Sequence, residues 1–421
     1  MWSLLRQRNF SLLWFAGLIS YIGNWMLYIS LPLAVYELTE STLAVSAMLV
    51  ANILPSIALG SVAGVFVDRW ERKRTMVIIN LLLAVSILPL LLVQSADWLW
   101  LIFIVRLVQS TLNQFFTPAE GAMLPQLVDE EFRVPANALN SLNNSLARLI
   151  GPALGGVVAA AVGLGGVVIV DVFTYLVAAI LLMLITVTSK PAPSPENEVT
   201  VSGALAKVKA EWLDGLRFIQ SRPIVRLLFL CIAIMSIGEG VIGTLFVPFV
   251  NNVLGGGALE VGWLVSAQAI GSLLGGMVIG GIGMRVKPYR LLAFGAILIG
   301  VIDFMIFNYY LFIPGVLPGI ILFVIVGVPV VSFITGYDTL LQASVEDGFR
   351  GRVIGAFGTT SSLFALLGTT FAGATGDILG IVPVINIQAY GYFTAGCICL
   401  FVFTRMFRRE KHMTEATINA N

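Results

Sequence analysis

Long apolar stretches recur along the whole chain, and short segments with charges, prolines and glycines separate them. Each stretch has roughly 20 residues or more, which as a helix can cross a hydrocarbon core of about 30 Å. Apolar and polar residues do not alternate within them, so helices rather than strands are the spanning elements. The pattern predicts twelve membrane-spanning helices, at residues 11–37, 43–67, 76–95, 98–119, 139–161, 165–187, 225–252, 260–283, 289–308, 311–335, 354–379 and 383–405.

The composition agrees with a protein embedded in lipid. Of the 421 residues, 58% are hydrophobic and 11% are charged, and the mean hydropathy is +0.95. A soluble domain carries about 25% charged residues. The formal net charge of +1 gives no electrostatic basis for binding nucleic acid. We therefore expect an all-α integral membrane protein without a nucleic-acid partner.

The positions of lysine and arginine predict the side of the membrane on which each loop lies. With the amino terminus in the cytoplasm, every lysine and arginine falls in a cytoplasmic segment except Arg106 and Arg148, which lie within spans. The outer loops then hold no basic residue, as the positive-inside rule requires. The first span follows Asn9 without a small-residue cleavage site, so no cleavable signal peptide is predicted. We expect a multi-pass protein of a bacterial-type cytoplasmic (inner) membrane, with both termini cytoplasmic.

The longest polar connection, residues 188–224, divides the spans six and six. It begins with a proline-rich segment, Lys190–Pro195, and continues with apolar residues at helical spacing from Leu205 to Ile219. The second part predicts an amphipathic helix, which lies either on the inner membrane face or against the inner loops. The expected division is a first six-helix bundle at 1–187, the linker at 188–224, a second six-helix bundle at 225–405 and a cytoplasmic tail at 406–421.

A dense cluster of charges between the second and third predicted spans matches a known signature. Five of its residues follow the spacing Gly-x-x-x-Asp-Arg-x-x-Arg-Lys: Gly64, Asp68, Arg69, Arg72 and Lys73. The segment resembles the gate loop of the major facilitator superfamily of transporters, although Glu71 stands where that loop has glycine. The resemblance implies that Asp68 holds the cytoplasmic ends of the two halves together by contacting the start of the eleventh span, near Arg352.

Further motifs support the same resemblance. Arg106 and Gln109 in the fourth span resemble the superfamily's Arg-x-x-Gln-Gly motif. A stretch of the fifth span resembles its antiporter motif, with Gly151, Pro152, Gly155 and Gly156. The segments Pro118–Pro125 and Ala136–Ser141 are typical of the twelve-span branch that holds macrolide-efflux and enterobactin-export proteins. The resemblance implies two pseudo-symmetric six-helix bundles that expose a central cavity to each side in turn, and export by antiport. The glycines also have a packing explanation, since small residues let helices approach closely.

Polar residues within the spans predict which helix faces line that cavity. A charge such as that of Arg106 costs several kcal/mol in the membrane unless it faces water or a partner. Gln109 and Asn113 follow it at i+3 and i+7, which places all three on one helix face. A structural pair with an acid, or hydrogen bonds between helices, would produce the same pattern. The predicted cavity residues are Asn24, Tyr28, Arg106, Gln109, Asn113, Asn144, Arg148 and Glu239.

Few acids lie within the spans, and these are the candidates for carrying a coupling proton. Glu239 falls about halfway through the seventh span, where we expect its carboxyl to be removed from water. It is the first choice, and Asp171 and Asp303 are the other two candidates. The alternative is that Glu239 is a neutral acid hydrogen-bonded to a neighbouring helix. Asn24 cannot titrate, although the branch often has aspartate at this position.

The sequence lacks the motifs of other kinds of chemistry. Its single histidine, His412, lies in the tail, and Cys231, Cys397 and Cys399 lie in apolar stretches. A histidine-based metal site within the spans is therefore excluded. The sequence has no phosphate-binding loop and no catalytic constellation. We expect no metal, no cofactor and no enzyme activity.

Together these patterns predict a secondary transporter of the multidrug-resistance kind. It would export a drug-like or siderophore-like amphipathic solute by alternating access, in exchange for protons, with sodium as the alternative coupling ion. Its partners would be the small-molecule substrate, the coupling ion and the lipid bilayer, and we expect a monomer. A lipid or glycolipid flippase on the same fold is the alternative. A non-transporting membrane sensor is disfavoured, because it would not need a polar face on the fourth span.

Overall fold

The computed structural model describes residues 3–60, 63–67, 69–186, 222–346 and 349–420. The chain within these ranges folds into helices and contains no strand, which confirms the predicted all-α fold. The predicted amphipathic helix of the linker lies outside the described residues, and so does Asp68 of the gate loop.

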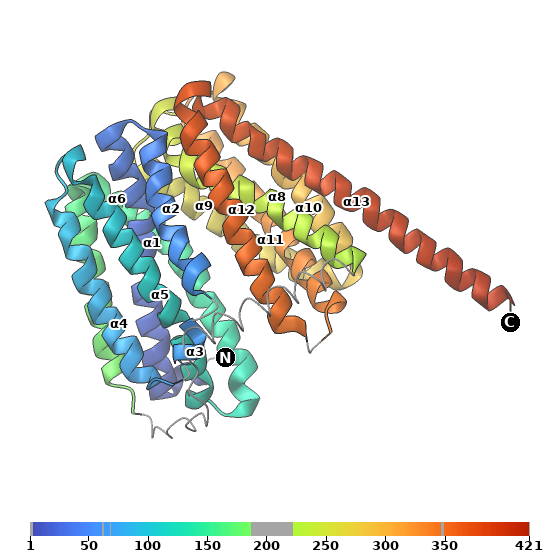
Figure 1. Ribbon diagram of the computed structural model, residues 1–421, viewed down its shortest axis with the longest axis horizontal. Helices are drawn as coiled ribbons and strands as arrows, with labels where there is room; N and C mark the ends of the chain where they lie inside the picture. The colour runs from blue at the N-terminus through green and yellow to red at the C-terminus, as the bar shows by residue number, and fades with distance from the viewer. Residues whose placement is uncertain (1–2, 61–62, 68, 187–221, 347–348, 421) are drawn as a thin grey trace. The chain divides into compact units, whose positions relative to one another are not determined.

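The helices follow the predicted apolar stretches (Figure 1). The first half of the chain forms α1 (Arg8–Thr39), α2 (Thr42–Leu59), α3 (Ala63–Val67), α4 (Arg72–Ile87), α5 (Leu99–Leu127) and α6 (Arg133–Met183). The second half forms α8 (Pro223–Pro248), α9 (Ala258–Ile282), α10 (Pro288–Asn308), α11 (Leu317–Ser344), α12 (Arg350–Leu379) and α13 (Ile381–Ala420). A 3-10 turn, Leu88–Leu92, extends α4, and a π-helical turn, Phe249–Val253, extends α8.

Eleven helices of the described chain are long and apolar enough to cross a membrane. The longest, Glu130–Met183, has 54 residues. As a straight helix it would measure about 80 Å, more than twice the thickness of a hydrocarbon core. It breaks at Gly163, whose φ of 70° and ψ of −170° suit glycine but not a residue with a Cβ. The break divides α6 into a first arm (133–162) and a second arm (164–183), close to the two spans predicted there.

The chain divides into two compact units. The first unit consists of Met1–Ala210, Gly243–Ala269 and Thr369–Ile378. The second unit consists of Glu211–Ile242, Ile270–Gly368 and Leu379–Asn421. The first unit therefore holds α1 to α6 together with two later segments, which comprise the carboxyl ends of α8 and α12 and the first half of α9.

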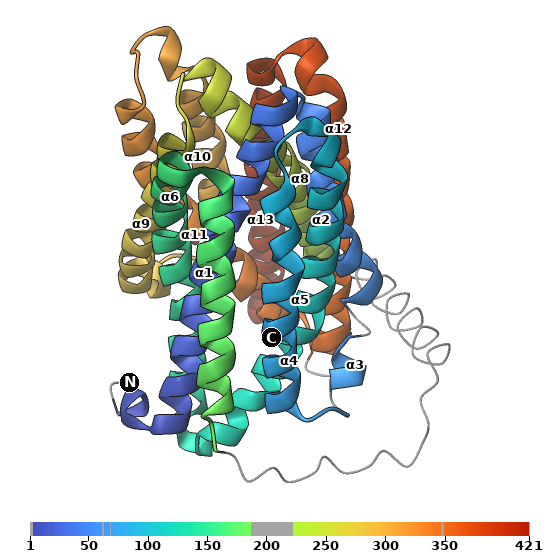
Figure 2. The ribbon, with the colours of Figure 1, turned by 90° about the vertical axis from the view of Figure 1, so that its left-hand side faces the viewer.

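The first unit is built on close packing between α1 and α6, and these helices run beside α4 and α5 in Figures 1 and 2. Two glycines of the antiporter-type motif face α1. A Cβ added to Gly151 would lie 2.5 Å from Trp25 Cβ, and one added to Gly155 would lie 2.8 Å from Met26 Cα. These positions of α6 therefore let the two backbones approach closely.

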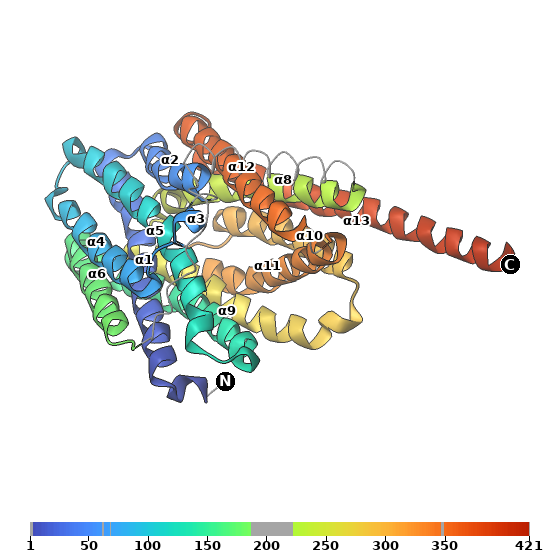
Figure 3. The same ribbon diagram turned by 60° about the horizontal axis from the view of Figure 1, so that its bottom comes forward.

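In the second unit, α10 packs against both α11 and α13 (Figure 3). Glycines again mark the contacts. A Cβ added to Gly295 would lie 2.6 Å from the backbone nitrogen of Phe333 in α11, and one added to Gly300 would lie 2.5 Å from that of Phe393 in α13. Both units therefore depend on small residues where helices meet, as membrane helices commonly do.

Replacing Gly155 by alanine should destabilise the first unit, because the added Cβ would lie too close to the backbone of α1. Overpacking of this kind costs about 1–3 kcal/mol. The measurement is the melting temperature of the purified protein in detergent. The matched control is Gly276→Ala in α9, where no atom lies within 4 Å of the added Cβ. Equal melting temperatures for the two variants would contradict the prediction.

Candidate functional site

A network of buried polar side chains centres on Arg106 of α5, which is 8% exposed. Its Nη2 donates a hydrogen bond to Asn52 Oδ1 of α2 at 2.9 Å, and its Nη1 donates to Gln109 Oε1 at 3.2 Å. The hydroxyl of Ser110 donates to the backbone carbonyl of Asn52 at 2.6 Å. The hydrogen bonds of Arg106 and Ser110 to Asn52 therefore hold α5 against α2.

The second arm of α6 adds an acid and a tyrosine to this network. Asp171 is fully buried and accepts a hydrogen bond from the hydroxyl of Thr174 at 3.1 Å. The hydroxyl of Tyr175 donates to Asn24 Oδ1 of α1 at 2.7 Å. Arg106 interacts electrostatically with both Asp171 and Tyr175. The network therefore joins four helices of the first unit around one cation and one acid.

Three polar atoms of the network are buried without a hydrogen-bond partner in the described part of the chain. They are Arg106 Nε, Gln109 Nε2 and Asp171 Oδ2. Most buried polar atoms in proteins have a partner, and an exception calls for an explanation, of which a functional role is one. This network can therefore donate hydrogen bonds to a polar group and accept one.

Gly23 of α1 is needed for this arrangement. A Cβ at this position would overlap Asp171 Oδ1 and the hydroxyl of Thr174. Only glycine lets the second arm of α6 bring its acid against α1. The residue after it, Asn24, then meets Tyr175.

The second unit holds a related cluster. Asp303 of α10 is 6% exposed and accepts a hydrogen bond from Gln388 Nε2 of α13 at 2.5 Å. One helical turn further, the hydroxyl of Tyr392 donates to the backbone carbonyl of Met235 in α8 at 3.1 Å. Glu239 of α8 interacts electrostatically with Asp303 and Tyr392. The side chain of Glu239 itself is exposed. The burial expected for Glu239 is therefore wrong, and the buried acids are Asp171 and Asp303.

The two clusters repeat one pattern in the two halves of the sequence. Gly23 in α1 packs against Asp171 and Thr174, and Gly238 in α8 packs against Tyr392. Each glycine precedes a polar residue, Asn24 or Glu239, and each facing helix carries a polar residue four positions before a tyrosine. The amide and the acid have exchanged places. The residue after the glycine is the amide Asn24 in the first unit and the acid Glu239 in the second, while the residue four positions before the tyrosine is the acid Asp171 in the first and the amide Gln388 in the second.

The other predicted cavity residues lie elsewhere in the first unit. Arg148 Nη2 donates to Gln268 Oε1 of α9 at 2.7 Å, and its guanidinium lies over the ring of Trp25 at 5.7 Å. Tyr28 is 38% exposed and makes an edge contact with Trp25. Asn113 is half-buried and Asn144 is exposed. The structure therefore brings together Asn24, Arg106 and Gln109, but not the whole predicted set.

Of the gate loop, the structure describes the residues around Asp68. Lys73 Nζ donates to the backbone carbonyl of Ile185 at 2.7 Å, at the end of the second arm of α6. The ring of Trp70 stacks on Phe115 of α5, with ring centres 5.7 Å apart. Arg69 is exposed, Arg72 is half-buried, and no atom lies within 4 Å of a Cβ added to Gly64. The predicted contact between Asp68 and the start of α12 lies outside the described residues.

The two later segments of the first unit contact the end where α1 leads into α2. Asp377 of α12 accepts hydrogen bonds from the backbone N–H of Thr42 at 3.0 Å and from the hydroxyl of Ser41 at 3.2 Å. It therefore caps the amino end of α2, where a negative charge is favourable. The hydroxyl of Ser46 donates to the carbonyl of Thr369 at 2.9 Å. We call these residues the α2–α12 contact.

The same end has two more contacts. The side-chain amide of Asn252, in the turn after α8, donates to the hydroxyl of Tyr36 in α1. The hydroxyl of Ser266 in α9 donates to the carbonyl of Leu149 in α6 at 2.8 Å. Hydrogen bonds thus tie α8, α9 and α12 to α1, α2 and α6 inside one unit.

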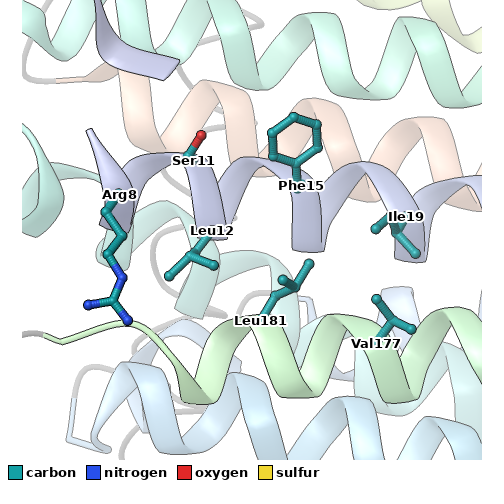
Figure 4. A pocket seen from close by; sticks show the side chains of 7 residues that line it. All are labelled: Arg8, Ser11, Leu12, Phe15, Ile19, Val177 and Leu181. Atoms are coloured by element: carbon teal, nitrogen blue, oxygen red, sulfur yellow. The ribbon is translucent and has the colours of Figure 1, made fainter. Parts of the chain in front are cut away.

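A separate groove of about 450 Å³ runs between α1 and the second arm of α6 (Figure 4). Apart from Arg8 and Ser11 at one end, apolar side chains line it. They are Leu12, Phe15 and Ile19 of α1 with Val177 and Leu181 of α6. None of the predicted cavity residues lines this groove.

Sequence reasoning missed two residues that the structure places in polar contacts, Asn52 and Glu120. Asn52 is an isolated polar residue in an apolar span. Glu120 had a signal, because it continues the polar face of Arg106 and Asn113 at spacings of seven. Glu120 is 4% exposed and accepts a hydrogen bond from the hydroxyl of Tyr21.

Eleven apolar helices of the described chain, the longest of them broken at Gly163, hold buried ionisable groups, and this combination is typical of a polytopic transport protein. Residues 1–420 match the family described as transmembrane secretion effector, a branch of the major facilitator superfamily, and the chain belongs to that family. This confirms the resemblance found in the motifs.

Related sequences support the same branch. The chain is 24% identical to macrolide efflux protein A of Streptococcus pyogenes over 382 residues, which cover 89% of this chain and 90% of the relative. It is 26% identical to the multidrug efflux pump Tap of Mycolicibacterium fortuitum over 384 residues, with 88% and 90% covered. An uncharacterized transporter of the superfamily from Bacillus subtilis, YfiS, is 25% identical over 391 residues, with 91% and 89% covered.

Solved structures share the fold. A POT family transporter in complex with a thioalcohol-conjugated peptide superposes with a TM-score of 0.73 at 11% identity, covering 95% of this chain and 96% of that one. A bacterial homologue of the iron transporter ferroportin in an inward-facing state gives a TM-score of 0.71 at 14% identity, covering 94% and 98%. At these identities the likeness concerns the fold alone.

A double-mutant cycle should detect the coupling between Arg106 and Asp171. Arg106→Gln and Asp171→Asn should each lower the melting temperature, because each leaves the opposite charge buried without its partner. The double variant should lose less than the sum of the two, by a coupling of about 0.5–3 kcal/mol.

The control cycle uses Arg133 and Glu130, an exposed pair 3.3 Å apart, whose coupling should be below about 1 kcal/mol. Additive effects for Arg106 and Asp171 would show that the two charges do not stabilise each other.

Proposed function

We propose that this transporter exports an amphipathic, drug-like or siderophore-like solute from the cytoplasm and exchanges it for protons. The observation that carries the proposal is the buried network of Arg106, Gln109 and Asp171. Ionisable groups within membrane spans are costly and mark substrate or ion pathways. The names of two relatives, a macrolide efflux protein and a multidrug efflux pump, support export of drug-like compounds.

In the proposed mechanism the network of the first unit binds a polar group of the solute. The unpaired Arg106 Nε and Gln109 Nε2 would donate hydrogen bonds, while Asp171 Oδ2 would accept one. The surrounding apolar side chains would bind the rest of the solute through its buried area. Asp171, Asp303 and Glu239 are the acids proposed to exchange protons. The two six-helix bundles, at 1–187 and 225–405, would move against each other during transport.

The orientation belongs to the same proposal. With both termini in the cytoplasm of a bacterial cell, the turn between α1 and α2 lies at the outer face. The α2–α12 contact would then be part of the outer gate. It must open when the solute leaves and close when the cytoplasmic side opens.

A growth assay tests the proposed export. Expression of the chain in a strain without its own efflux pumps should raise the inhibitory concentration of at least one compound in a panel that includes macrolides. The Arg106→Gln variant, expressed to the same level, should lose this resistance. Collapse of the pH gradient should stop efflux of the compound from loaded cells.

Each result has a contrary outcome. Wild-type sensitivity across the whole panel would contradict export of drug-like solutes. Efflux that continues without a pH gradient but stops without a sodium gradient would replace the proton by sodium. Neither result depends on knowing the shape of the cavity in advance.

A lipid flippase is the second candidate, and the groove of Figure 4 favours it. The groove is apolar along its length, with the cationic Arg8 at one end, which suits an acyl chain and an anionic headgroup. Reconstituted protein would then move a labelled phospholipid between the leaflets of liposomes without any soluble substrate. Absence of lipid movement together with drug resistance would rule this candidate out.

Loss of the Asp377 carboxylate should open the proposed outer gate. Asp377→Ala removes hydrogen bonds to Thr42 and Ser41 and the charge at the amino end of α2. A loss of about 1–2 kcal/mol shifts the equilibrium between closed and open states by roughly 5–30-fold. The measurement is labelling of Leu49→Cys by a membrane-impermeant maleimide added outside, in a background where the three native cysteines are alanine.

Leu49 lies on α2 beyond this contact and is 8% exposed, so labelling should be slow until the gate opens. The matched control is Asp97→Ala, which removes an exposed acid at the start of α5 and should leave the labelling rate unchanged. Equal rates for the Asp377 and Asp97 variants would contradict the gate assignment.

A further inference from the structure

Glu120 of α5 is a buried acid that the network around Arg106 does not use. It lies 14 residues beyond Arg106, which corresponds to about 21 Å along the helix. Its Oε2 accepts a hydrogen bond from the hydroxyl of Tyr21 of α1 at 2.6 Å. Its Oε1 lies 3.2 Å from the position of a Cβ on Gly17 of α1, so the absence of a side chain at Gly17 makes room for it.

The described side chains that the structure places next to this carboxyl, Tyr21 and Asn143, are uncharged. From α6, the fully buried Asn143 lies against the same face of Gly17, where its Nδ2 is 3.3 Å from the position of a Cβ. That amide nitrogen donates to the carbonyl of Trp14 at 2.8 Å, while Asn143 Oδ1 has no hydrogen-bond partner in the described part of the chain. The indole of Trp14 donates to the carbonyl of Leu139 at 2.9 Å.

No described lysine or arginine pairs with Glu120. Among the described residues of α1, α2, α3, α4 and α6, Tyr21 is the titratable group that interacts with it. Asp171, by contrast, lies close enough to Arg106 to interact with it electrostatically. A carboxylate buried without a cation is costly, and binding a proton removes that cost.

We propose that Glu120 binds a coupling proton and releases it to the cytoplasm. The inference rests on the proposed function and adds to it a proton site that is separate from Arg106 and Asp171. In the proposed orientation α5 runs inwards and ends at Leu127. Glu120 therefore lies about 10 Å along the helix from its cytoplasmic end, within reach of water when the cytoplasmic side opens. Tyr21 belongs to α1, so a movement of α1 away from α5 would remove the Tyr21 hydroxyl from the Glu120 carboxyl and let water reach it.

Infrared difference spectroscopy of the full chain in liposomes tests this proton site without any substrate. A change of pH should produce a carboxylic-acid carbonyl band that is missing from the Glu120→Gln variant. Glutamine keeps the size of the side chain and an oxygen that can accept the hydrogen bond of Tyr21. The matched control is Glu130→Gln, an exposed acid of the connection between α5 and α6, which should leave the band unchanged.

Tyr21→Phe keeps the carboxyl and removes its hydrogen-bond donor. The band should remain in this variant but appear at a different pH, an effect that a purely structural tie between α1 and α5 would not produce. A Glu120→Gln spectrum identical to that of the wild type, for folded protein of equal melting temperature, would overturn the proposal. If Glu120→Gln does not fold, an unshifted band in Tyr21→Phe overturns it instead.

Transport provides the second measurement, with erythromycin as the first probe and any compound found in the growth assay as the next. Glu120→Gln should reduce transport driven by a pH gradient at least 10-fold and keep exchange of labelled for unlabelled probe. Full gradient-driven transport in this variant would overturn the proposal. If the wild type transports none of the compounds, the export proposal fails, while the infrared band still decides whether Glu120 binds a proton.

Discussion

Arg106 must remain charged inside a bundle of apolar helices, and the polar contacts of the first unit are arranged around that requirement. A buried charge without partners costs several kcal/mol, whereas one with hydrogen bonds and an opposite charge is tolerated. Asn52 on α2, Gln109 on α5 and Asp171 on α6 supply these partners. Lipid gives helices little hydrophobic reason to choose one register over another. The hydrogen bond of this cation to Asn52 therefore helps to fix how α5 aligns with α2, and its attraction to Asp171 favours a position of α6 close by.

Close approach at glycine is the condition for this arrangement in both halves of the sequence. Gly23 makes room for Asp171, and Gly238 makes room for Tyr392. The two units differ in their charged groups, since Asp171 interacts electrostatically with Arg106, while Asp303 interacts with another acid, Glu239. A repeated backbone arrangement thus carries different chemistry in its two copies.

The sequence predicted the fold because hydrophobic length is a strong signal in membrane proteins. The break of α6 at Gly163 fell between two predicted spans, although glycines also occur within spans such as α9. The site was predicted in part. Arg106 and Gln109 stand out as polar residues on an apolar helix, but their partner Asn52 belongs to another span, and one sequence gives no distance between spans. The prediction that Glu239 is buried was wrong, because periodicity cannot tell which face of α8 other helices cover.

The placement of basic residues limits how the proposed outer face can close. In the proposed orientation the outer loops contain no lysine or arginine, so a salt bridge between loops is not available there. A carboxylate at the amino end of a helix is the charge-assisted contact that needs no basic side chain, because backbone N–H groups and the helix dipole supply the positive end. Asp377 makes this contact with α2 through Thr42. The distribution of basic residues on which the proposed orientation rests therefore also favours helix capping over ion pairing at this end.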